Sequence, residues 1–377
     1  MNSGMLSLLA ILGLLALNGC DSQAPQRVSG LAPLRIGSVL GETALEGYQR
    51  AEQVRSFSFP EDHGAHREFR SEWWYLTLTL SDAAGRDYGV QFTIFRQALA
   101  PVPTTDNPWQ SEQVYLGHLA VTDVAAGQHR EFERFARAHP QLAGARAEPF
   151  AVWLDGWRLA AAADDDAEAG SWRLTAQAAE VALDLRLSEP APLLFQGERG
   201  LSRKGPGQAS YYFSIPGFAV SGSLILGGVE HTVSGGGWFD REWSTSVLSG
   251  DQLGWDWFAL RLDSGTNFMA FQLRRKDGAR DLYDYAVRVS ADGDSQQFGP
   301  DQFQLQPVRF WQDSTGTRWP VEWSITVAGE QWRVVAALDD QRMDTSLVYW
   351  EGLVYVYDQH QRRIGRGYME LTGYSDE

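Results

Sequence analysis

Residues 73–80 read WWYLTLTL. Along this stretch the leucines share one face with Trp74 and the threonines share the other face with Tyr75, because side chains alternate along an extended strand. A turn rich in Asp, Ala and Gly follows at residues 81–87, and the same alternation resumes at Tyr88. Two alternating runs joined by a short polar turn predict a β-hairpin.

The pattern with a period of two residues recurs along much of the chain. Many short strands separated by Gly and Asp turns are typical of antiparallel barrels or sandwiches, so we expect an all-β fold. One short helix is expected near Arg130–His139. The further strand segments are Val114–Val124, Ala151–Ala160, Trp172–Ala178, Val181–Leu187, Tyr211–Phe213 and Ala219–Leu226.

A later segment looks like a diverged copy of the first hairpin. Gly254–Phe258 opens it with an aromatic cluster and Arg274 closes it, as Ser71–Tyr75 and Arg96 do in the first. Two homologous β-domains explain the similarity, and chance likeness of two hairpins is the alternative. The domains are placed at 57–228 and 229–377, with the Gly-rich stretch from Gly227 to Gly237 marking the boundary.

The N-terminus predicts export. Residues 1–19 contain no charged side chain, and the apolar run Leu6–Leu17 is too short to span a bilayer, so it fits a signal peptide. Leu17-Asn18-Gly19-Cys20 resembles the lipobox of bacterial lipoproteins, which implies lipidation of Cys20, the single cysteine. An ordinary signal peptide followed by an unrelated Cys is the alternative. Residues 20–56 are interpreted as a tether on a periplasm-facing, inner-membrane lipoprotein.

Length and charge limit the possible partners. The 358 residues left after cleavage (377 − 19) exceed the usual size of a single core, which favours two domains. A net charge of −16 opposes binding to phosphate backbones and anionic lipid head groups, so no nucleic-acid partner is expected. Attachment to the membrane must then come from the lipid on Cys20.

The sequence has 15 tryptophans, a number that indicates a role for these side chains beyond filling the core. Each buried indole N–H needs a hydrogen-bond partner, which makes Trp a demanding residue for filling a core. A barrel lumen that holds an apolar ligand would give these side chains a further use, and simple packing of two barrel cores is the alternative. The residues that we expect to contact such a ligand are Trp73, Trp74, Trp238, Trp243, Trp255, Trp257, His63, His66, Glu72 and Asp256.

The segment Gly237–Trp243 carries the candidate acids. In an extended strand Asp240 and Glu242 point to one side, while Arg241 points to the other. Two carboxylates on one face beside indoles raise at least one pKa, which gives a usable general acid. The catalytic candidates are therefore Asp240 and Glu242, with Arg241; the alternative is a structural network in which Arg241 keeps both ionised.

Other kinds of site have weaker support. His63-x-x-His66, with Asp62 and Glu72, could be read as a metal site, but no third His lies near, and we expect rim histidines and no metal. The sequence has no nucleophile elbow, phosphate loop or dinucleotide fingerprint, so no cofactor is expected.

Seven segments carry a family resemblance: Phe59–His66, Ser71–Tyr75, Gln91–Arg96, Trp238–Ser244, Gly254–Phe258, Tyr349–Gly352 and Gly367–Tyr374. Together they resemble the carotenoid 1,2-hydratase/AttH-like family of lipocalin-like proteins, over about residues 55 to 377. The resemblance implies two lipocalin-like β-barrel domains packed together and ligands of isoprenoid or polyketide type. In the strand after Gly254–Phe258, where the resemblance leads us to expect an acidic residue, the sequence has Phe271 and Gln272.

Two functions remain open from the sequence. The first is a hydro-lyase that binds an apolar isoprenoid-like ligand and adds water to a C=C bond, with an acid that protonates the alkene and aromatic faces that stabilise the cation. The second is a non-catalytic lipid- or metabolite-binding lipoprotein that serves an ABC-type transporter permease.

Overall fold

The computed structural model describes residues 46–101, 111–162, 170–245 and 248–375. The predicted signal peptide, Cys20 and the tether up to residue 45 lie outside them. In the described ranges no helix has the length and apolar character needed to cross a membrane. Residues 46–56, predicted as the end of the tether, already contact the fold: Tyr211 Oη donates to Gln53 O at 2.9 Å, and Ala51 is buried.

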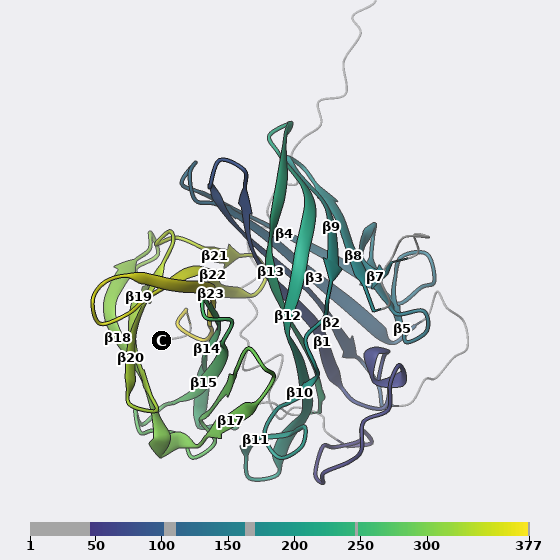
Figure 1. The fold of residues 1–377 in the computed structure, drawn as a ribbon. Helices are drawn as coiled ribbons and strands as arrows, with labels where there is room; N and C mark the ends of the chain where they lie inside the picture. Colours follow the sequence, from purple (N-terminus) through teal and green to yellow (C-terminus); the bar gives the residue numbers. More distant parts are fainter. Residues whose placement is uncertain (1–45, 102–110, 163–169, 246–247, 376–377) are drawn as a thin grey trace, which may run out of the picture. The chain divides into compact units, whose positions relative to one another are not determined.

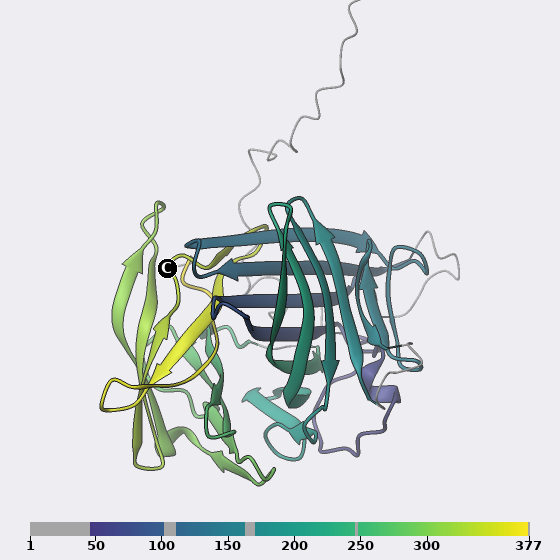
Figure 2. The same cartoon turned by 45° about the horizontal axis from the view of Figure 1, so that its top comes forward.

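The described residues form two antiparallel sheets (Figures 1 and 2). The first has 13 strands in the order β4-β3-β2-β1-β13-β12-β9-β8-β7-β6-β5, with β10 and β11 paired to β12. It curls until β6, near one end, contacts β2, β3 and β4 at the other. Its strands are β1 (Ser71–Asp82), β2 (Asp87–Ala98), β3 (Gln113–Asp123), β4 (Gln128–Arg137), β5 (Ala143–Arg146), β6 (Ala151–Leu154), β7 (Trp157–Ala161), β8 (Trp172–Ala178), β9 (Val181–Ser188), β10 (Leu194–Phe195), β11 (Leu201–Gly205), β12 (Gln208–Leu226) and β13 (Val229–Ser244).

The second sheet has 10 strands in the order β17-β16-β15-β14-β23-β22-β20-β19-β18, with β21 paired to β22. It curls into the ring on the left of Figure 1. Its strands are β14 (Gln252–Leu262), β15 (Asn267–Arg275), β16 (Tyr285–Val289), β17 (Ser295–Phe298), β18 (Phe303–Gln312), β19 (Arg318–Val327), β20 (Glu330–Ala336), β21 (Arg342–Asp344), β22 (Val348–Tyr357) and β23 (Arg363–Leu371). The described residues also include two 3₁₀ turns, η1 (Glu61–His63) and η3 (Pro300–Gln302).

The prediction of an all-β protein with two lipocalin-like barrels is confirmed, and so is the first hairpin, in which Leu76 of β1 stands opposite Phe92 of β2. The second hairpin is β14–β15, and it occupies the same place in its sheet: β14 lies between β15 and β23 as β1 lies between β2 and β13. The repeat seen in the sequence is therefore a repeat in topology.

The expected helix near Arg130–His139 is wrong. These residues belong largely to β4, which pairs with β3 along its whole length, from Val114 opposite Arg137 to Asp123 opposite Gln128. Glu, Arg and Ala favour helix locally, but pairing with an available strand edge decides the conformation here, because strand preference depends strongly on context.

The strand pairing also corrects the domain boundary. A boundary at 228/229 would separate β12 from β13, yet these strands pair from Leu226 opposite Val229 to Ser210 opposite Ser244. The first sheet therefore extends to Ser244. Gly235–Gly237, expected at the boundary, lie inside β13, and Gly227 and Gly228 form the turn between β12 and β13. A Cβ at Gly235 would stand 2.0 Å from Thr79 O of β1, and only glycine permits that approach.

Large side chains fill both barrel interiors, where the sequence had suggested a ligand. Trp74, Trp157 and Trp243 are buried in the core of the first barrel. Trp319, Trp323 and Trp350 are buried in the core of the second. A third cluster joins the outer faces of the two sheets, and it includes Tyr75, Trp238, Trp257 and Tyr349. A cavity of about 380 Å³ opens at the second barrel, where Arg274, Arg275 and Arg280 contribute to its lining. The cavities lined by several aromatic side chains lie between the barrels.

Candidate active site

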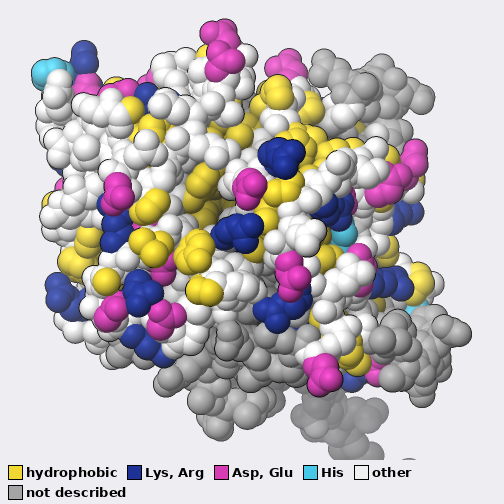
Figure 3. Space-filling model, turned by 90° about the horizontal axis from the view of Figure 1, so that it is seen from below, with side chains coloured by type: hydrophobic (Ala, Val, Ile, Leu, Met, Phe, Trp, Pro, Cys, Tyr) yellow, Lys and Arg dark blue, Asp and Glu magenta, His cyan; other side chains and the backbone are white. Residues whose placement is uncertain are grey.

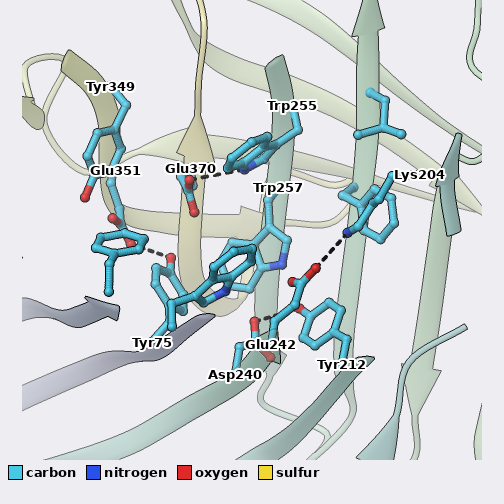
Figure 4. A pocket seen from close by; sticks show the side chains of 14 residues that line it. Tyr75, Lys204, Tyr212, Asp240, Glu242, Trp255, Trp257, Tyr349, Glu351 and Glu370 are labelled. Carbon is cyan, nitrogen blue, oxygen red and sulfur yellow. Dashed lines mark hydrogen bonds and ion pairs between the residues drawn. The ribbon is translucent and has the colours of Figure 1, made fainter. Parts of the chain in front are cut away.

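A cavity lies between the outer faces of the two sheets, where β1 contacts β23 and β2 contacts β22. We call it the polar cavity; its volume is about 70 Å³. Four carboxyl groups reach it, two from each sheet (Figure 4). Its lining includes Trp73 and Tyr75 of β1, Asp240 and Glu242 of β13, Trp255 and Trp257 of β14, Tyr349 and Glu351 of β22, and Glu370 of β23.

A second cavity of about 170 Å³ adjoins the first, and we call it the apolar arm. The two share Trp73, Phe95, Trp255, Tyr349 and Glu370 in their linings. The remaining apolar lining of the arm comes from both sheets, and Phe135, which is 53% exposed, belongs to it, so the arm leads towards the surface. Those side chains are Val114, Leu116, Phe135 and Leu347.

The carboxyl groups of Glu351 and Glu370 form the centre of the site. The two residues stand directly opposite each other on β22 and β23, an arrangement that brings Cβ atoms to about 4.5–5.5 Å and makes like charges repel. Burial raises the pKa of Glu370 to about 8, although a hydrogen bond from Trp255 Nε1 at 3.1 Å opposes the rise. Burial, and next the charge of Glu370, raise the pKa of Glu351 well above its usual range. At neutral pH the pair therefore holds protons.

Glu370 is the more accessible of the two. Glu351 is fully buried, whereas Glu370 retains partial exposure and lines both the polar cavity and the apolar arm. A protonated carboxyl at the junction of the two spaces is placed to meet an apolar ligand.

Asp240 lies on the sheet opposite this pair. Both of its oxygens accept hydrogen bonds: Tyr212 Oη donates to Oδ2 at 2.8 Å, and Trp238 Nε1 and Ser214 Oγ donate to Oδ1. Burial raises its pKa to about 7, and these donors limit the rise. Asp240 can therefore exchange a proton near neutral pH.

Lys204 of β11 supplies a cation at the other side of the polar cavity. Its Nζ lies 3.5 Å from Glu242 Oε1 and 4.1 Å from the centroid of the Phe271 ring. The aromatic wall continues through Trp257, whose ring packs edge-on against Tyr75 with centroids 5.3 Å apart. Tyr75 in turn donates a hydrogen bond to Glu351 Oε1 (Figure 4).

The structure brings together about half of the residues predicted from the sequence. Asp240, Glu242, Trp73, Trp255 and Trp257 line the polar cavity. Trp238 stands behind them as a donor to Asp240 and a neighbour of Trp257.

The other candidates of the first barrel point into its interior, because neighbouring residues on a strand face opposite ways. Arg241 does not accompany the acids: it pairs with Glu72, and its guanidinium lies 4.0 Å from the centroid of the Trp74 ring. Glu72 borders the apolar arm, but its carboxylate also binds Arg96 and His66. His66 stacks on Trp243 with ring centroids 3.8 Å apart.

His63 and Asp256 line neither the polar cavity nor the apolar arm. His63 packs among the aromatic rings of Phe59, Phe150 and Phe213 in the first barrel, and burial lowers its pKa to about 4. Asp256 accepts hydrogen bonds from Gln272 Nε2 at 2.7 Å and Tyr374 Oη at 2.8 Å. In the described ranges no group of three or more His, Cys, Asp and Glu side chains is placed to hold a metal ion.

Sequence reasoning missed the Glu351–Glu370 pair, Lys204 and the three tyrosines of the cavity. A signal existed for the two glutamates: Glu351 is the single charged residue of 348–357, and Glu370 is the single charged residue of 367–373. At the strand expected to carry an acid, Phe271 lines the cavity and Gln272 binds Asp256, while the carboxyls come from β22 and β23 instead.

Comparisons with known proteins agree with this architecture. The sequence profile of the family described as AttH-like matches residues 50–374. The crystal structure of a Nitrosomonas europaea protein assigned as AttH is 38% identical, with a TM-score of 0.76 over 86% of this chain and 99% of that one. Kievitone hydratase from Nectria haematococca is 15% identical and shares the fold, with a TM-score of 0.63 over 85% of this chain and 94% of that one. No curated protein matches the sequence.

Proposed function

The chain belongs to the AttH-like family, and from this premise we propose that it is a hydratase-like enzyme that adds water to a C=C bond of an apolar, isoprenoid-like ligand. The observation that carries the proposal is the Glu351–Glu370 pair, which holds protons at neutral pH inside an aromatic cavity with an apolar arm. Kievitone hydratase is by its name a hydratase, but it shares only the fold, so the cavity is the stronger support.

The acid in this proposal is Glu370. Hydration of an isolated alkene begins with transfer of a proton to one carbon of the double bond, which needs a carboxyl group that is still protonated at the working pH. Glu370 meets this need, since burial raises its pKa to about 8 and it faces both cavities. Asp240 and Glu242, the acids favoured from the sequence, line the polar cavity but not the apolar arm, which Glu370 also reaches.

The remaining steps need groups that the cavity supplies. Proton transfer leaves a carbocation, which the ring faces of Trp255, Trp257 and Tyr75 can stabilise by cation–π attraction. Water then forms the C–O bond and loses one proton to a carboxylate. Asp240, with a pKa of about 7, is suited to accept it. One proton is consumed and one is returned, so the reaction adds water and nothing else.

The apolar arm also supports a second candidate function. Its lining is dominated by aromatic and aliphatic side chains, which favour binding of a hydrophobic chain without any chemistry. In this case the protein is a lipid- or metabolite-binding carrier for an ABC-type transporter permease.

One experiment separates the two functions. Gently extracted protein is analysed by native mass spectrometry for a co-purified apolar compound, and this compound, farnesol and squalene are each incubated with the protein in ¹⁸O-labelled water. The enzyme should yield a product heavier by one labelled water, because the cavity acid protonates a trisubstituted C=C bond. A compound that binds tightly and never gains water would favour the carrier.

We further propose that the protein is a periplasm-facing lipoprotein held in the membrane through Cys20. On the face in Figure 3, Lys and Arg side chains are interspersed with Asp and Glu, so this face has no single-sign charge with which to bind lipid head groups. Cys20→Ser should abolish incorporation of labelled fatty acid and release the protein from the membrane fraction. If Cys20→Ser still incorporates labelled fatty acid and stays in the membrane fraction, anchoring through Cys20 is contradicted.

A further inference from the structure

Glu351 is connected to groups beyond the polar cavity. It is fully buried and accepts a hydrogen bond from Tyr75 Oη. Tyr349 lies two residues before Glu351 on β22, and both side chains line the polar cavity. The Tyr349 hydroxyl lies 2.8 Å from His118 Nδ1 of β3. Tyr349 is therefore hydrogen-bonded to a histidine on the other sheet and accompanies Glu351 in the lining of the polar cavity.

The connection continues through His118 to the surface. His118 is fully buried, and its second nitrogen, Nε2, lies 3.1 Å from Glu133 Oε2 of β4. The side chain of Glu133 is 18% exposed, and its carboxylate also accepts hydrogen bonds from the backbone and hydroxyl of Ser346. Each ring nitrogen of His118 therefore contacts a titratable side chain. Nδ1 contacts Tyr349 on the side of the cavity, and Nε2 contacts Glu133, which is partly exposed to solvent.

We propose that Tyr349, His118 and Glu133 form a proton pathway that connects the buried Glu351 carboxyl with solvent. Imidazole suits this role, because one nitrogen can accept a proton while the other releases one. The inference rests on the proposed function, in which the cavity acid loses its proton in every turnover.

The pathway balances protons without any other reactant. For inward transfer, Glu133 gives a proton to His118 Nε2, Nδ1 gives one to Tyr349 Oη, and Tyr349 passes its own proton to the carboxylate of Glu351; water then reprotonates Glu133. In each turnover Glu370 gives a proton to the alkene and Asp240 takes one from water, so inward transfer reloads the glutamate pair. Asp240 releases its proton through the cavity, and rotation of the His118 ring restores the first tautomer. Glu370, directly opposite Glu351, shares its proton equilibrium.

A purely structural role is the competing explanation, since His118 also ties the two sheets together. Thr122 provides a matched control on the same strand: it is fully buried, and its Oγ1 donates to Gln341 Oε1 of the second sheet at 2.9 Å. Its hydroxyl is hydrogen-bonded to Gln341 and His129, and neither residue belongs to the cavity carboxyls or the pathway. Thr122→Val removes an inter-sheet hydrogen bond and leaves the pathway intact.

The test follows exchange of the protonated carboxyl by infrared spectroscopy after the full-length, ligand-free protein is moved into D₂O. His118→Ala should slow the shift of the carboxyl C=O band by about tenfold or more, and added imidazole should restore the rate, as expected for a lost proton carrier. Glu133→Gln should slow it too, and Thr122→Val should leave it unchanged. If His118→Ala does not fold, His118→Gln keeps a hydrogen bond to Tyr349 and should show the same slow exchange.

The outcomes distinguish this pathway from the proposed reaction. Wild-type exchange rates in the His118 variants, or equal slowing by Thr122→Val, would overturn the pathway whatever the protein does to a ligand. Slow, imidazole-sensitive exchange in a protein that never hydrates farnesol, squalene or its co-purified compound would retain the pathway and reject the hydratase.

Discussion

Glu370→Gln is expected to lower the rate of water addition by about 10²–10⁴-fold, the usual contribution of a general acid. Gln keeps the shape of the side chain and an oxygen that can accept from Trp255 Nε1, but it has no proton to give to the alkene. Turnover is measured by incorporation of ¹⁸O from labelled water into the co-purified compound or farnesol.

Ligand affinity serves as the control for this variant. Because the apolar arm and the aromatic wall are unchanged, binding measured by quenching of Trp fluorescence should stay close to that of the wild type. Asp240→Asn should reduce turnover less if Asp240 only accepts the proton of water. Full activity of Glu370→Gln would remove Glu370 from the mechanism.

Glu72→Gln is expected to destabilise the protein by about 3–5 kcal/mol, the range found when one partner of a buried ion pair is removed. The Glu72 carboxylate pairs with Arg96 and Arg241, and all three side chains are buried in the first barrel. Removing its charge leaves two guanidinium groups in the core with less compensation. The free energy of unfolding from urea denaturation measures the loss.

A surface pair provides the comparison. Asp184 and Arg173 form a bidentate ion pair, and their side chains are 49% and 47% exposed. Asp184→Asn should cost only about 0–1 kcal/mol, because water screens exposed charges. Equal losses of unfolding free energy in Glu72→Gln and Asp184→Asn would show that the buried Glu72–Arg96–Arg241 network does not stabilise the first barrel more than a surface ion pair does.

Strand alternation made part of the site predictable. Once residues 73–80 form a strand, Trp74 and Tyr75 must face opposite ways, and the same rule separates Asp240 and Glu242 from Arg241. The rule does not say which face is the barrel interior. Both faces of β1 and β13 are buried, one in the barrel and one against the second sheet. The apolar pattern of the sequence therefore could not show that Trp73 faces the cavity and Trp74 the barrel interior.

The carboxyl pair depends on information that no local pattern carries. Glu351 meets Glu370 only because β22 and β23 pair in one register, which includes a bulge near Val356. Lys204 reaches Glu242 from β11, a short strand paired to β12. Tertiary pairing likewise makes the expected helix a strand, β4, and places Gly235–Gly237, expected at a domain boundary, inside the first sheet.

The most direct measurement is an infrared pH titration of the full-length protein, which reports whether the cavity contains a protonated carboxyl group. The wild type should show the C=O band of a buried carboxylic acid at neutral pH. Since the pKa of Glu370 is raised to about 8, part of that band should disappear as the pH rises through this value, and Glu370→Gln should lack that part. A spectrum with only ionised carboxylates at neutral pH, or one that is identical in Glu370→Gln, would contradict an acid between the two barrels.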